Sequence, residues 1–125
     1  QMIINDDLGE GVKLIGYVDS PNVLYEQGDV AINPTYQGTG LKIKTFEAIS
    51  YDKVTMVHPH SMKGVFEKDK TSLFFSDKPQ DWIDFLVKLW RTKEILITDM
   101  KKSNGDYMRR MNEFIVNEYI RFLND

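Results

Sequence analysis

The sequence predicts an α/β domain with an open, Rossmann-like parallel sheet and flanking helices. Strand-like apolar runs alternate with helical patterns along the chain, and this order produces a sheet with right-handed crossovers. The run at 29–33 (D-V-A-I-N) has a continuous apolar centre, which is typical of a strand buried on both faces. A glycine-containing loop at 36–40 then leads into a helical pattern.

The first elements are predicted from capping residues as well as from apolar runs. Residues 12–18 (V-K-L-I-G-Y-V) are sufficiently apolar and β-branched for a strand. Ser20 and Pro21 indicate a helix start, because serine caps helices and proline fits the first helical position. A short helix is therefore expected over 22–27, followed by the strand at 29–33.

Helical and strand-like segments alternate again after the glycine loop. We predict a helix over 41–51, a strand at 54–57, a loop at 58–64 and a short strand at 72–75. Pro79 then begins a helix with a strongly apolar stripe at helical spacing. The stripe consists of Trp82, Phe85, Leu86, Leu89 and Trp90.

The chain is predicted to be a single domain, 1–125, with a Rossmann-like part at about 1–92 and C-terminal helices at about 93–125. The helical tail is expected to break near 103–105, where Ser-Asn-Gly occurs. The apolar faces of the last helices are expected to form core or domain contacts rather than a ligand site.

Composition excludes several classes of function. The net charge of −3 does not favour nucleic acid as a partner. The absence of cysteine excludes disulfides, thiolate zinc sites and cysteine nucleophiles, and agrees with a cytoplasmic protein. No apolar run has the length of a membrane span, and no signal peptide is visible. The opening residues Q-M-I-I-N lack a start methionine, so we expect a fragment of a longer chain.

Three loops are expected to share one edge of the sheet. Open α/β sheets bind ligands at the carboxyl ends of their strands. The segments that follow the predicted strands there are Val18–Asp19, the stretch 37–47 and the loop 58–64. We therefore group them as one candidate site.

Gly38, Thr39 and Gly40 form the first candidate motif in this group. Glycine lets the backbone approach an anion closely, and the free N–H groups at a helix start attract one. An ordinary turn between strand and helix explains the same residues equally well, because a short glycine motif is a weak signal.

Two lysines and one acid follow the glycines. Lys42 and Lys44 lie near the N-terminus of the predicted helix, where the helix dipole disfavours positive charge unless an anion is bound. Their side chains point about 200° apart, so only one of them is expected to reach a ligand. Glu47 lies in an apolar run, where a carboxylate needs hydrogen-bond donors such as a ribose diol. Solvated lysines and a lysine–Glu47 ion pair are the alternatives. His58 and His60 lack a third ligand nearby, so no metal is expected.

The ordered set of motifs from Val12 to Val65 resembles the donor-binding domain of GT-B-fold glycosyltransferases, and most closely family 4, group 1. The matching pieces are L-I-G-Y-V-D at 14–19, L-Y-E-Q-G-D-V at 24–30, N-P at 33–34, G-T-G-L-K-I-K-T-F-E-A at 38–48, and V-T-M-V at 54–57 with G-V at 64–65. The resemblance covers about half of the chain.

The resemblance implies a nucleoside-diphosphate sugar as donor substrate, with no separate cofactor, and a hexosyltransferase of retaining type in polysaccharide biosynthesis. By similarity, Glu47 binds the ribose hydroxyls and Val18 and Asp19 lie against the base. The amides of Gly38, Thr39, Gly40 and Leu41 meet the diphosphate or the sugar. We infer from charge and position that Lys42 or Lys44 assists the phosphates.

The sequence departs from the family pattern at the first acid of the paired-glutamate motif. That position falls on Thr39 by spacing, or on Gln37 when the glycines are aligned, and we assign the sugar contact to Gln37. The basic pair that binds the diphosphate and the acceptor domain are expected upstream of Gln1. The isolated chain is therefore expected to bind nucleotide weakly and to be inactive.

Other functions remain open from the sequence. A nonenzymatic sugar-nucleotide-binding module, a GT-B-type epimerase and an interaction domain without a small ligand all fit the same fold. Binding of UDP, GDP or ADP separates the interaction domain from the others, and product analysis identifies an epimerase.

Overall fold

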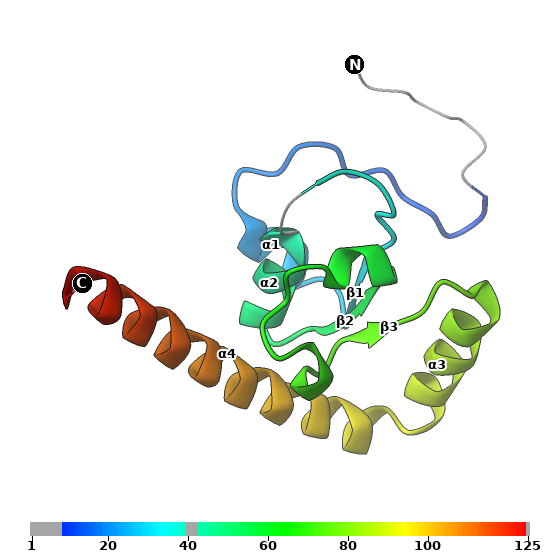
Figure 1. The fold of residues 1–125 in the computed structure, drawn as a ribbon. Coiled ribbons are helices and arrows are strands. Elements are labelled where there is room, and N and C mark those ends of the chain that lie inside the picture. Colours follow the sequence, from blue (N-terminus) through cyan, green and yellow to red (C-terminus); the bar gives the residue numbers. More distant parts are fainter. Residues whose placement is uncertain (1–8, 40–42, 125) are drawn as a thin grey trace.

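The computed structural model describes residues 9–39 and 43–124, and it shows a small parallel sheet with helices around it (Figure 1). This arrangement confirms the predicted α/β, Rossmann-like fold class. The elements in chain order are α1 (Pro21–Tyr25), β1 (Val30–Asn33), α2 (Ile43–Ser50), β2 (Val54–Val57), the 3-10 helices η1 (Pro59–Met62) and η2 (Lys68–Lys70), β3 (Phe74–Phe75), α3 (Pro79–Arg91) and α4 (Lys93–Asn124).

The described sheet has the strand order β1-β2-β3, and both strand pairs are parallel. The register runs from Val30 opposite Val54 to Asn33 opposite Val57. All four residues of β2 are buried, because the strand lies between two neighbours and contacts both α2 and α4. Its continuous apolar run is thus explained by burial on both faces.

The core lies where α4 crosses the sheet and α2. Tyr107 is the largest fully buried side chain, and its hydroxyl donates a hydrogen bond to the Phe66 carbonyl oxygen at 2.9 Å. An aromatic group covers the other side of β3, where Phe74 stacks on Phe85 with ring centroids 4.2 Å apart. The core cluster comprises Ile49, Val57, Met62, Val65, Leu73 and Tyr107.

The predicted strand at 12–18 is wrong. This segment has no strand structure and forms no part of the described sheet. Its large side chains are exposed, from 49% for Ile15 to 90% for Tyr17. A strand forms when its backbone N–H and C=O groups pair with a neighbour, and no described residue supplies a ladder to this segment. Apolar, β-branched composition alone does not provide that partner.

The predicted break near 103–105 is also wrong, because α4 continues through it. Asn104 is buried, and its side chain is bonded on both sides: it accepts from the Ser72 hydroxyl and donates to the Lys53 carbonyl oxygen at 3.1 Å. These contacts offset the weak helix propensity of asparagine and glycine.

The helix starts follow the proline signals. Pro21 and Pro79 each occupy the first turn, as predicted. Ser20 stands at the N-cap of α1, but its side chain makes no capping hydrogen bond. In the stripe of α3, Leu89 is buried whereas Trp90 is 82% exposed, so the stripe is only partly core.

Candidate functional site

Two of the three predicted loops meet at the carboxyl edge of the sheet. β1 and β2 end in register, and the His58 backbone N–H extends the ladder by donating to the Asn33 carbonyl oxygen at 3.2 Å. The loop after Asn33 and the loop after Val57 therefore begin side by side. The expectation that 37–47 and 58–64 share an edge is confirmed for the described part of these stretches.

Asn33 anchors the first half of the glycine loop. Its Oδ1 accepts hydrogen bonds from the Thr35 backbone N–H at 3.3 Å and from the Thr35 hydroxyl at 2.6 Å. Its Nδ2 donates to Thr45 Oγ1 at 3.3 Å, which joins the end of β1 to α2. Asn33 is part of the N-P motif quoted above but was not predicted to have this role, although asparagine that bonds a backbone N–H two residues on is a known turn signal.

The loop after β2 holds the glycine loop from its other side. The Ser61 hydroxyl donates to the Thr35 carbonyl oxygen at 3.1 Å, and His60 Nε2 lies 2.8 Å from the Gly38 carbonyl oxygen. His58 Nδ1 accepts the His60 backbone N–H at 3.1 Å, capping η1. The histidines thus have structural contacts that sequence reasoning missed. The described residues contain no group of three His, Cys, Asp or Glu side chains suited to a metal.

The described part of the glycine loop, residues 37–39, is exposed. Gly38 has φ +93°, a left-handed conformation that glycine adopts readily and other residues adopt at a cost. Gln37 and Thr39 are exposed next to it. Gly40, Leu41 and Lys42 lie outside the described residues, and their binding roles stay predictions.

Lys44 and Glu47 lie on the same side of α2, since residues three apart are neighbours on a helix surface. Lys44 is exposed, whereas Glu47 is half-buried. Within 9–39 and 43–124, no hydrogen bond or ion pair involves the Glu47 carboxylate. A lysine ion pair with Glu47, the alternative raised from the sequence, does not form with any lysine in that part of the chain.

A stacked tyrosine pair accompanies Glu47. The rings of Tyr25 and Tyr51 lie 4.7 Å apart and nearly parallel, so α1 is packed against the end of α2. Burial raises the pKa of Tyr25 above its ordinary value, and the nearby Glu47 carboxylate and Tyr51 raise it further. The sequence analysis assigned no role to these tyrosines.

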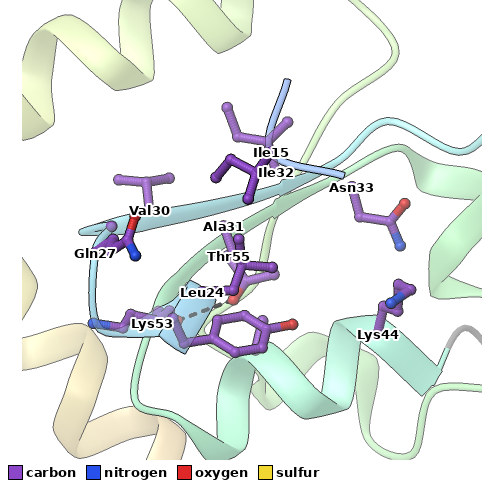
Figure 2. Close-up of a pocket in the computed structure, with 13 residues that line it drawn as sticks. Ile15, Leu24, Gln27, Val30, Ala31, Ile32, Asn33, Lys44, Lys53 and Thr55 are labelled. Carbon is purple, nitrogen blue, oxygen red and sulfur yellow. Dashed lines mark hydrogen bonds between the residues drawn. The ribbon is translucent and has the colours of Figure 1, made fainter. Parts of the chain in front are cut away.

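A cavity of about 500 Å³ runs along β1 and is also lined by residues of α1, α2 and β2. Figure 2 shows Asn33 and Lys44 at one end of it and Val30, Gln27 and Lys53 at the other. Ile15 is the contribution of segment 12–18, whereas Val18 is half-buried and Asp19 exposed without lining the cavity. The predicted placement of Val18 and Asp19 against the nucleobase stays a prediction.

Comparison with known proteins identifies the family. Residues 1–92 match the family described as glycosyl transferases, group 1. The chain belongs to this family and contains a glycosyltransferase domain with a GT-B-like, Rossmann-type layout. Neither curated proteins nor solved structures gave a match. Among the described helices, none combines the length and apolar character needed to cross a membrane.

Proposed function

We propose that this glycosyltransferase domain binds a nucleoside-diphosphate sugar, from which the enzyme transfers the sugar to an acceptor. The observation that carries the proposal is Glu47. It is a half-buried acid with no polar partner among the described residues, on the helix that follows a glycine loop at the carboxyl edge of the sheet. A carboxylate in such a place is stabilised by hydrogen-bond donors from a ligand.

Each candidate residue has a chemical role in this proposal. The Glu47 carboxylate accepts hydrogen bonds from the two ribose hydroxyls. Lys44, at the cavity end near Asn33, balances phosphate charge. Gln37 contacts the sugar, and the backbone N–H groups around Gly38 bind the diphosphate or the sugar.

The same groups support the chemical step. As the bond to the sugar breaks, negative charge grows on the nucleotide diphosphate, and fixed N–H dipoles and cations lower the energy of that charge. We further propose a hexosyl donor, retention of configuration at the anomeric carbon, and a polysaccharide product. Product analysis of the transfer reaction tests these three points.

Calorimetric titration with UDP, GDP and ADP tests donor binding by this chain. We expect one of these nucleotides to bind, and Glu47→Gln to weaken it by about 10-fold or more, since a hydrogen bond to a charged group contributes about 1.5–3 kcal/mol. Glu94→Gln is the matched control, because Glu94 is exposed in the first turn of α4. Equal affinities for Glu47→Gln and wild type would contradict the assignment of Glu47.

A further inference from the structure

We infer that His60 is a positioning residue that sets the direction of the Gly38–Thr39 peptide, so that the Thr39 N–H is available to the donor substrate. The inference rests on the proposed donor binding, and it goes further by assigning a function to a residue outside the glycine loop. The main evidence is that His60 Nε2 lies 2.8 Å from the Gly38 carbonyl oxygen, although the two residues are 22 positions apart in the sequence.

Peptide geometry links this contact to the ligand side of the loop. The described residues contain no cis peptide bond, and in a planar trans peptide the C=O and the N–H point in opposite directions. The Gly38 carbonyl points at His60. The N–H of Thr39, which belongs to the same peptide plane, must therefore point away from His60.

Gly38 makes this peptide orientation adjustable in the absence of His60. Its φ of +93° lies in a region that glycine enters about as readily as φ below zero. Glycine also lacks the Cβ that restricts ψ, the dihedral angle that turns the Gly38–Thr39 peptide plane, so this peptide has little intrinsic preference for the observed direction. The hydrogen bond from His60 supplies that preference before any ligand arrives, which reduces the ordering cost of binding.

The backbone of His60 is anchored next to the end of β2. It lies in η1, directly after β2, and its backbone N–H donates to the capping His58 Nδ1 at 3.1 Å. The next residue, Ser61, is 1% exposed and bonds the Thr35 carbonyl oxygen. The backbone that carries the imidazole is thus anchored next to the strand ends.

Two hydrogen bonds define which ring nitrogen carries a hydrogen, one for His60 and one for His58. A carbonyl oxygen only accepts, so His60 Nε2 must carry a hydrogen. His58 Nδ1 accepts a hydrogen bond from the His60 backbone N–H, so this nitrogen must be unprotonated. Nitrogen-15 NMR of the wild-type chain reads these states directly. A protonated Nε2 on His60 supports the hydrogen bond to Gly38. An unprotonated Nε2 overturns the inference, and this test needs no substituted variant.

Nucleotide titration of two His60 variants tests the consequence for binding. His60→Ala removes the donor and is expected to weaken the nucleotide that binds wild type by about 5- to 10-fold, the size of one ordinary hydrogen bond. His60→Gln keeps an N–H near the position of Nε2 and is expected to restore affinity to within about 2-fold of wild type on the same reasoning. Saturating nucleotide should shift the Thr39 amide resonance in wild type and His60→Gln, and less in His60→Ala.

Thr98→Ala is the control, because it removes a hydroxyl-to-carbonyl hydrogen bond to Glu94 within α4, outside the proposed site, and leaves the Gly38 contact intact. It is expected to keep wild-type affinity. Wild-type affinity in His60→Ala, with Glu47→Gln still defective, would overturn this inference alone. Absence of binding in wild type would overturn it together with the proposed function.

Discussion

Segment 12–18 and strand β2 have similar composition and opposite structures. Both are apolar and rich in β-branched residues. β2 is buried at every position, pairs with β1 on one side and β3 on the other, and contacts α2 and α4. Segment 12–18 has no regular secondary structure, is exposed at every residue except the half-buried Val18, and lies outside the described sheet. The comparison shows that strand formation here depends on paired edges and covered faces, and that propensity only permits it.

The glycine loop shows the same dependence at the level of a site. Its described part is held by Asn33 from β1 and by His60 and Ser61 from the turn after β2. Asn33 ends β1, His60 and Ser61 come directly after β2, and these two strands are paired in register. Val18 ends a segment without such pairing, and Asp19 follows it. Loops are positioned by the strands that precede them.

Among substitutions that test this comparison, Met56→Ala is expected to change the free energy of unfolding most. The side chain is 0% exposed in the middle of β2, so its truncation leaves a cavity. We expect the free energy of unfolding to fall by about 2–5 kcal/mol, measured by urea denaturation. Met56→Leu conserves volume and should cost less than about 1.5 kcal/mol. Similar losses for the two variants would show that packing does not set the stability of β2.

Asn104→Ala is expected to have an intermediate effect. Its amide bonds the Lys53 carbonyl oxygen immediately before β2, and its Oδ1 accepts from Ser72. Removal leaves two part-buried polar groups without this partner, so we expect a loss of about 1–3 kcal/mol in urea denaturation. Asn112→Ala, at an exposed position of the same helix, is the control and should change stability by less than about 0.5 kcal/mol. An equal, small change in both would contradict a role of Asn104 in holding β2.

These residues also show which parts of the fold were predictable. The strand at 54–57 and the sharing of an edge by two loops follow from local patterns and from a general rule of parallel sheets. The placement of Glu47 on the helix after the glycine loop follows from the motif in which it occurs. The contacts of Asn104 and His60 were not predictable, because each joins segments more than 20 residues apart. The continuity of α4 through Gly105 depends on such a contact and was therefore predicted wrongly.

Leu14→Ala has the smallest expected effect and separates the two regions most directly. Leu14 is 55% exposed, so its truncation should change the free energy of unfolding by less than about 0.5 kcal/mol. Hydrogen exchange of the wild-type chain gives an independent measurement. Amides of β2 should exchange slowly, through global opening, whereas amides at 13–18 should exchange near the unprotected rate.

Comparable protection in both regions would reverse the interpretation of segment 12–18. It would mean that the segment is paired in solution, as its composition predicts, and Leu14→Ala would then cost clearly more than a surface substitution. Val18 and Asp19 would in that case follow a paired strand, and the rule that places ligands at the carboxyl ends of strands would apply to them as well. The exchange rates at 13–18 therefore decide whether this segment pairs with the sheet in solution, which is the condition for placing its last residues at the proposed donor site.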